Sequence, residues 1–369
     1  MPMKLNTVIV LLLLVLFCNL NSANAQVIED LYDAEIAVQN QSATSQKQAF
    51  TAALQQVFVK VRGNRDLLSN QQVKKALKKA TSFVRSYSYE IQDSQLYLVI
   101  NFDPQRVQTS IRNAGFPVWD KRRPETIVWL AIQSPDGTKR KIATAIEFPD
   151  IFQQLSLTAA ERGISLMFPL WDLDDIQRLN VFDIWGGFSN QISAASERYV
   201  VPSILSARVF LSEDLHNENT SLPENENIAK QWVADWTMME DGRLLAGQVQ
   251  QENPLAVVEA IVDALADELS LKYAIDLAQI DSADTKIQII VNNINSLEYY
   301  IQVLSFLENM SVVNSATLIQ QQGTRAMFEL DLLGDVEDLT NALSLDANIK
   351  PVVDDFGQPI PGLEFFWVK

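Results

Sequence analysis

Cysteine and histidine each occur once in the 369 residues, and neither stands where it would support catalysis. Cys18 ends an apolar run near the start of the chain, and His216 lies in a polar segment. Ser-His-Asp and Cys-His catalysis need an imidazole held rigidly beside the nucleophile, and histidine-based metal sites need the same rigidity. These classes of enzyme and metal site are therefore excluded.

Long apolar runs are missing after the first 25 residues. Those residues contain Lys4, an apolar run at 8–17 and the small-x-small sequence Ala23-Asn24-Ala25, which is the pattern of a cleaved export signal. The run is shorter than the roughly 20 residues that a membrane-spanning helix needs. We therefore expect a periplasmic protein that is cleaved after Ala25 and has no transmembrane span.

The same cleavage removes Cys18. A lipid-anchored cysteine would follow a small residue, whereas Phe17 precedes this one. The anchor alternative is therefore disfavoured, and the mature protein is expected to contain no cysteine and no disulfide, although it folds in an oxidising compartment.

Phosphate-binding glycine motifs are absent as well. Neither G-x-x-x-x-G-K-[ST] nor a G-x-G-x-x-G after a strand occurs, so we expect no cofactor, and we assign no catalytic residue. The acidic residues Asp172, Asp174 and Asp175 follow a predicted buried strand, at the start of a helix. They would complement the helix dipole, bind Ca²⁺ or Mg²⁺, or supply an acid and a base for glycan hydrolysis. We favour the helix dipole and keep the metal site as the main alternative.

The charge is unevenly divided. Residues 26–123 carry fourteen Lys/Arg and nine Asp/Glu, whereas residues 124–369 carry fourteen and thirty-seven. The basic residues concentrate in two clusters, namely Lys74, Lys75, Lys78 and Lys79, and Lys121, Arg122 and Arg123. The first cluster is most simply the wet side of an amphipathic helix. As a binding face it would suit an anionic lipid or glycan, and the acidic remainder makes nucleic acid an unsuitable partner.

The periodicity predicts three modules. Residues 26–116 form an α+β module of order β-α-α-β-β-α, in which Ser45 and Gln48 have capping-box spacing and Gly63 ends the first helix. Residues 124–275 form a mixed α/β domain with a polar insertion at 212–227. Residues 284–350 have the β-α-β-β-α order of a ferredoxin-like module, and the apolar tail at 351–369 is expected to pack on a neighbour. The fold class is thus α+β and α/β.

Several stretches together resemble a known family. They are "LYDAEIAV", "ALQQVFVKVRGNRDLL", "RPETIVWLAI", "PLWDLDD", "SERYVVPSILSARV" and the strand with Trp232 and Trp236. In this order they are similar to the domain-of-unknown-function 2066 family of exported proteobacterial proteins. The resemblance implies a periplasmic location and brings no activity.

Seven tryptophans raise the possibility of sugar stacking. Trp129, Trp232 and Trp236 lie in predicted strands and are expected in cores. Trp119, Trp171 and Trp185 lie in predicted loops, and Trp171 and Trp185 are our candidates, with the four lysines, for partner binding. Packing at a domain junction is the simpler alternative for all three.

The leading hypothesis is a non-enzymatic interaction or assembly-factor protein of the cell envelope with a protein partner. It predicts an uncovered sheet edge or an exposed apolar patch. The alternatives are a carboxylate-dependent enzyme acting on envelope glycan, which predicts two acids in a cleft, and a solute- or lipid-binding protein, which predicts a large apolar cavity.

Overall fold

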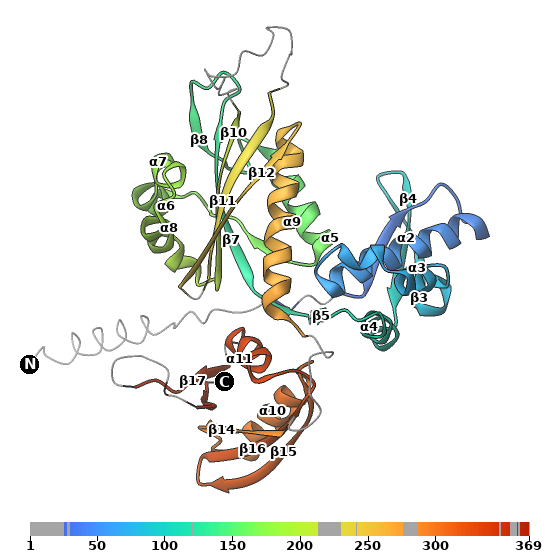
Figure 1. Ribbon diagram of the computed structural model, residues 1–369, viewed down its shortest axis with the longest axis vertical. Coiled ribbons are helices and arrows are strands. Elements are labelled where there is room, and N and C mark those ends of the chain that lie inside the picture. The colour runs from blue at the N-terminus through green and yellow to red at the C-terminus, as the bar shows by residue number, and fades with distance from the viewer. Residues whose placement is uncertain are drawn as a thin grey trace, which may run out of the picture.

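The computed structural model describes most of the chain after its first 25 residues. It covers residues 26–27, 30–119, 121–212, 230–240, 242–275, 286–346, 348–354, 360 and 362–368. The expected export signal with Cys18, and His216 with most of the polar insertion, lie outside these residues. Helices and strands occur along the whole described part, and several sheets form (Figure 1), so the expected mixture of α+β and α/β structure is confirmed.

The N-terminal module is a three-stranded antiparallel sheet, in the order β2-β4-β3, that packs with its helices around one core. Its elements are β1 (Gln26–Val27), β2 (Asp33–Ala37), α2 (Ala43–Arg62), η1 (Asp66–Ser69), α3 (Gln71–Leu77), η2 (Ala80–Phe83), β3 (Val84–Gln92), β4 (Gln95–Phe102) and α4 (Pro104–Asn113). The N-cap of α2 is Ser42 rather than Ser45, because the Ser42 hydroxyl accepts from the Ser45 N–H. Gly63 ends the helix with φ +78°, as expected.

The middle domain has three layers (Figure 1). Helices α5 and α9 pack on one face of a six-stranded sheet, and α6, α7 and α8 pack on the other. Its elements are β5 (Val118–Trp119), β6 (Arg122–Arg123), β7 (Glu125–Gln133), β8 (Arg140–Ile142), α5 (Pro149–Arg162), β9 (Ser165–Met167), α6 (Leu173–Arg178), α7 (Val181–Trp185), α8 (Ser189–Ser196), η3 (Glu197–Tyr199), β10 (Ser203–Leu211), β11 (Trp232–Glu240), β12 (Arg243–Gln251), α9 (Pro254–Tyr273) and β13 (Ala274–Ile275).

Strand β7 is the centre of this sheet. It pairs in parallel with β10 on one side, and on the other side with β9 in parallel and with β8 in antiparallel fashion. Its side chains are buried from Thr126 to Ile132, as the continuous apolar run predicts for a strand covered on both faces. Beyond β10 the sheet continues through β11 and ends at β12.

The C-terminal module keeps the predicted order and adds a strand from the tail. Its elements are β14 (Lys286–Asn292), α10 (Leu297–Glu308), β15 (Val313–Gln322), β16 (Arg325–Leu332), α11 (Val336–Ser344), β17 (Ile349–Pro351) and β18 (Glu364–Trp367). The sheet order is β15-β16-β14-β18-β17. Strand β18 lies parallel to β14 and between it and β17, because burial of Phe365 and Trp367 makes the tail part of the core. The ferredoxin-like pattern therefore holds for β14–β16 and is extended by the tail.

The N-terminal module and the middle domain meet at two buried arginines. The Arg123 guanidinium donates to the carbonyl oxygens of Lys60 (2.6 Å) and Gly163 (2.7 Å), near the ends of α2 and α5. It also lies 4.0 Å from the centre of the Trp119 ring. Arg123 and Trp119 are fully buried, so Arg123 does not belong to an exposed basic cluster. Trp119 packs at a domain junction, which was the simpler alternative for this residue, and is not exposed for recognition.

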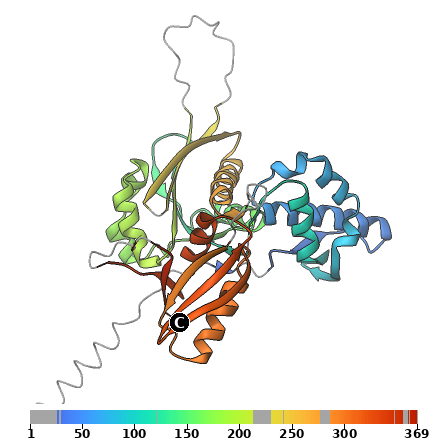
Figure 2. The same cartoon turned by 60° about the horizontal axis from the view of Figure 1, so that its bottom comes forward.

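Arg162 is the second buried arginine. It donates to the carbonyl oxygen of Gly63 at 2.6 Å and to the carboxylates of Asp263 and Asp267 on α9. Gly63 itself touches the junction, because a Cβ there would lie 2.5 Å from both Ser270 and the Trp119 ring. Together these contacts fix the end of α2 against α5 and α9. In Figure 2 the N-terminal module lies beside this part of the middle domain.

None of the helices in the described ranges is long and apolar enough to cross a bilayer.

Candidate functional site

The predicted acidic group forms an ion-pair cluster. Asp172 is the N-cap of α6 and accepts from both terminal nitrogens of Arg198, at 2.6 and 2.8 Å. Asp175 is fully buried and accepts from Arg198 at 3.1 Å, from the Tyr199 hydroxyl at 2.5 Å and from the Trp171 N–H at 2.8 Å. Asp174 is largely exposed and 4.0 Å from Arg198.

The protonation behaviour of this cluster fits an ion pair. Hydrogen bonding from Arg198, and then from the Asp175 N–H, lowers the pKa of Asp172 to about 2. Burial, and then the hydrogen bond to Asp175, raises the pKa of Tyr199 to about 12. The Arg198 guanidinium therefore already occupies the carboxylate oxygens that a metal ion would need as ligands. No group of three metal-binding side chains occurs in the ranges that the structure describes. This arrangement favours the capping role over the metal site.

The four predicted lysines are exposed. Helix α3 ends at Leu77, so Lys74 and Lys75 lie on the helix, whereas Lys78 and Lys79 lie in the turn after it. Val73 is the fully buried residue of this helix. The lysines are exposed within six consecutive residues, and their binding of an anionic lipid or glycan stays a prediction.

Trp171 and Trp185 are partly buried on the face of the middle sheet that carries α6–α8. Trp171 has φ +52° and contributes its backbone N–H to Asp175. Trp185 lies beside Phe210, with the Arg140 guanidinium 4.1 Å from the centre of one of its rings. Both side chains therefore pack inside one domain, and Trp185 also borders a pocket.

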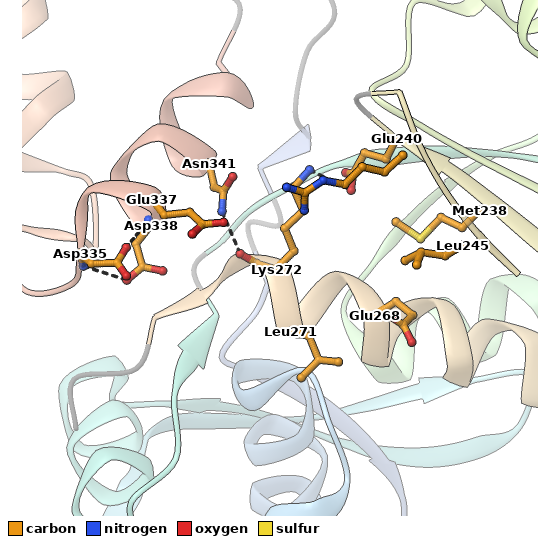
Figure 3. A pocket seen from close by; sticks show the side chains of 11 residues that line it. Met238, Glu240, Leu245, Glu268, Leu271, Lys272, Asp335, Glu337, Asp338 and Asn341 are labelled. Carbon is orange, nitrogen blue, oxygen red and sulfur yellow. Dashed lines mark hydrogen bonds and ion pairs between the residues drawn. The ribbon is translucent and has the colours of Figure 1, made fainter. Parts of the chain in front are cut away.

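Sequence reasoning missed a cleft of about 400 Å³ between the middle domain and the C-terminal module (Figure 3). Its walls come from β11, β12 and the end of α9 on one side and from α11 on the other. Five carboxylates and two basic side chains line it, namely Glu240, Glu268, Asp335, Glu337 and Asp338, and Arg243 and Lys272. The cleft is therefore acidic.

Three of the five carboxylates have structural roles. Glu240 is buried, 3.0 Å from the Lys272 ammonium, and accepts from the Tyr273 hydroxyl at 2.7 Å. Asp335 and Asp338 form a capping box at the start of α11, in which each side chain accepts from the other's backbone N–H. The two modules are joined here by the Asn341 amide, which donates to the Lys272 carbonyl oxygen at 3.2 Å.

The other two carboxylates face the cleft without a partner. Within the described ranges, Glu268 on α9 and Glu337 on α11 have no hydrogen bond or ion pair. Apolar side chains border them, since Leu271 is 71% and Leu245 is 44% exposed. The surface thus combines negative charge with exposed aliphatic groups, which suits a ligand that is both cationic and apolar.

Strand β12 begins at this cleft and forms a free edge of the middle sheet. All nine of its residues pair with β11 without a register shift, and no described strand pairs with its other side. Arg243 is its single charged residue. The other long edge strands are irregular, because β15 has two register shifts and β3 has one. Bulges and charges are the usual protection of edge strands, and β12 has little of either.

Gly247 keeps the middle of this edge regular. It pairs with Trp236 on β11, and a Cβ on it would lie 2.5 Å from the Trp236 ring. The indole therefore covers the backbone of β12 on one face and stays almost fully buried. No larger side chain at this position would leave the strand flat.

Comparison with known families gives a match to the C-terminal module, which forms one wall of the cleft. A family model described as DUF2066 matches residues 286–357. The match lies within the C-terminal module, which is thus similar to this family. The resemblance to it is confirmed, although the stretches that carried it lie before this range. A second model, described as a domain of unknown function (DUF8605), matches residues 25–120, which include the first two of those stretches. No curated protein matches the chain.

The DUF2066 module supplies one wall of the cleft, and the domain between the two matched ranges supplies the other. Asp335, Glu337 and Asp338 lie within the matched residues, whereas Glu268 lies in the middle domain. No sequence pattern predicted that the two walls meet, because about sixty residues separate the end of α9 from the start of α11. The one local signal was "RLLAGQ", in which Leu244 and Leu245 are adjacent instead of alternating with polar residues.

Proposed function

We propose that the protein is a non-enzymatic interaction protein of the periplasm that binds an extended segment of an envelope protein along β12. The observation that carries this proposal is the regular nine-residue edge of β12, which opens into the acidic cleft. The periplasmic part rests on the leader pattern of residues 1–25.

Strand addition suits β12 because the backbone N–H and C=O groups on its outer side, away from β11, pair with no described strand. An added strand would satisfy these donors and acceptors, and side chains at alternate positions would supply specificity. Leu244, at 54% exposure, and the exposed Gln248 and Gln250 lie on one face of the strand. A partner strand paired with β12 would place its side chains beside these residues on one face and beside Leu245 on the other.

The cleft gives the bound segment a direction. Arg243 and Leu245 belong both to the start of β12 and to the cleft wall. The end of a partner segment that runs past Arg243 would enter between Glu268 and Glu337. A basic residue followed by an apolar one is the chemistry that this end of the site recognises.

The alternatives receive less support from the same geometry. Glycan hydrolysis needs an acid and a base that face one bond, whereas Glu240 is held by Lys272 and the pair Asp335 and Asp338 caps α11. A solute- or lipid-binding protein needs an apolar cavity, and eight of the eleven residues that line the cleft are polar or charged.

The test is photo-crosslinking in living cells from single positions on β12. A photoreactive residue is placed in turn at Leu244, Ala246, Gln248 and Gln250, and the partner residue captured by each is identified by mass spectrometry. Strand pairing predicts that all four positions capture one segment of one protein, at partner residues that shift by two for each step. Captures scattered over unrelated proteins, or a single partner residue for all four positions, would contradict the proposal.

A matched pair of variants controls for nonspecific exposure. Leu245→Lys places a charge on the β12 edge, and Ile319→Lys places one on the β15 edge, where the side chain is equally exposed (46% against 44%). We expect the first to lower the crosslinking yield roughly fivefold or more, because lysine on an edge opposes strand addition. The second is expected to leave the yield unchanged, and equal losses would contradict the assignment to β12.

A further inference from the structure

A second pocket lies at the other end of the middle sheet, away from the DUF2066 module. It measures about 500 Å³ and is bordered by Gln133 at the end of β7, by Phe210 and Leu211 at the end of β10, by Arg140 on β8 and by Trp185 at the end of α7. Figure 1 shows the ends of β8 and β10 far from the C-terminal module. Nothing in the proposed partner site uses these residues.

The topology places this pocket where α/β sheets bind ligands. From β7 the chain passes through α5 to β9 on one side, and then through α6–α8 to β10 on the other side. Strands β8 and β9 thus lie on one side of β7 and β10 lies on the other, and the pocket lies at the carboxyl ends of β7 and β10. This position is the crevice in which open α/β sheets bind small molecules.

The pocket is basic in an acidic part of the chain. Residues 124–369 carry an excess of acidic side chains, yet three cations line the pocket, namely Arg140, Arg208 and Lys230, against the single acid Asp136. That acid is already engaged, because the hydroxyl groups of Ser134 and Thr138 donate to its carboxylate. Within the described ranges, Arg140 and Lys230 have no carboxylate partner.

Neighbouring groups hold the two guanidinium groups in place. Arg208 is fixed by Asp235 at 2.8 and 2.9 Å and donates to the Trp185 carbonyl oxygen at 2.7 Å. Arg140 lies over the Trp185 ring at 4.1 Å, so a cation–π contact orients it without using its N–H donors. Such pre-ordered, planar donor sets bind oxyanions through two parallel hydrogen bonds.

We propose that this pocket binds a phosphate group carried by a small organic molecule or a lipid. Arg140 and Lys230 contact the phosphate oxygens, Arg208 adds to the positive field, and Trp185 positions Arg140. The pocket volume corresponds to a ligand of about the size of a sugar phosphate. Trp185, which the sequence singled out for partner binding, is thus a positioning residue for an anion site.

The test uses the full mature chain and two probes at low ionic strength. Binding of glucose 1-phosphate is measured by isothermal titration calorimetry, with glucose as the uncharged control, and binding of phosphatidylglycerol vesicles is measured by co-sedimentation against phosphatidylcholine vesicles. A soluble ligand predicts heat with the sugar phosphate and none with glucose. A lipid headgroup predicts co-sedimentation with the anionic vesicles only.

Variants tie either result to the pocket. Arg140→Gln is expected to weaken binding roughly tenfold or more, since a hydrogen bond to a charged group is lost, and Trp185→Leu is expected to weaken it less because it only releases Arg140. Arg178→Gln, an exposed arginine on α6 away from the pocket, is expected to bind like the unmodified protein. Arg140 is exposed, so its replacement leaves the fold intact. Failure of both probes, or binding that Arg140→Gln does not weaken, overturns the proposal.

Discussion

At the junction between the N-terminal module and the middle domain, two arginines are buried among carbonyl oxygens and carboxylates, whereas at the junction with the DUF2066 module carboxylates line an open cleft. Helix α9 takes part in both. Its Asp263 and Asp267 bind Arg162, and its last turn carries Lys272, whose carbonyl oxygen accepts from Asn341. The same helix thus forms a closed, paired contact at one place and an open contact with unpaired charge at the other.

The difference indicates what each junction does. Buried, paired charge fixes orientation, since its partners have few other arrangements, and unpaired charge beside exposed leucines leaves a surface that a partner can use. The closed junction therefore fixes two modules as one body, and the open junction is the surface for which we propose partner binding.

Replacing Arg162 is expected to have the largest effect. Arg162→Ala removes the buried guanidinium that donates to the Gly63 carbonyl oxygen and to the partly exposed Asp263 and Asp267 carboxylates. The loss of these charge-assisted hydrogen bonds costs about 3–5 kcal/mol of the free energy of unfolding. Urea denaturation followed by circular dichroism measures the loss. The exposed Arg178→Ala is the control and is expected to change little. Equal stability of both variants would mean that the closed junction contributes nothing to folding.

Gly63→Ala tests the same junction through packing. Alanine at φ +78° is strained, and its methyl group would lie within 2.5 Å of the Trp119 ring; strain and overpacking together cost roughly 2–4 kcal/mol. Gly323→Ala is the matched control, because Gly323 has φ +60° and no neighbour within 4 Å. It is expected to lose only the strain, about 1–2 kcal/mol. Similar losses in the two variants would show that the close approach is relieved without cost.

Asn341→Ala tests the open junction. It removes one partly buried hydrogen bond to Lys272, worth about 0.5–1.5 kcal/mol. The expected result is a small drop in stability, with faster amide hydrogen exchange in α11 and unchanged exchange in α2. A loss as large as that of Arg162→Ala would contradict the contrast between the two junctions.

Replacing Asp172 is expected to change stability least. Asp172 lies in a charge cluster that belongs to neither junction. Its pKa of about 2 in the folded protein lies below the ordinary value, so its ion pair stabilises the folded chain at pH values above about 4 and this contribution is lost as the pH falls toward 2. Asp172→Asn is expected to flatten the pH dependence of stability in this window. Urea denaturation at several pH values measures it, with the exposed Asp174→Asn as the control. Wild-type pH dependence in Asp172→Asn would refute the assigned pKa.

Local patterns predicted the elements well, because they depend on neighbours in the chain. The end of α2 at Gly63 and the buried apolar run of β7 both follow from short-range spacing. The tail was expected to pack on a neighbour, but its insertion as β18 depends on an open position beside β14, which no local pattern reveals.

The sites were harder to predict, since they depend on side chains that meet from distant segments. The sequence placed Arg123 in a basic cluster and Trp119 in a loop, and only the meeting of the ends of α2 and α5 shows why both are buried. Asp172 was correctly placed at a helix start, whereas its partner Arg198 lies in another element. The cleft could not be predicted from the sequence, because its walls come from the distant helices α9 and α11. Its acidic residues also resemble ordinary surface residues in the sequence.

Helix α9 also has a mechanical consequence. It runs for 20 residues, or roughly 30 Å at 1.5 Å per residue. The N-terminal module is fixed near its side through Arg162, and the cleft lies at its end. Tension applied by a tethered partner at the cleft would be carried along a stiff helix and its sheet rather than through a soft hinge. The N-terminal module would then move together with whatever pulls on the cleft.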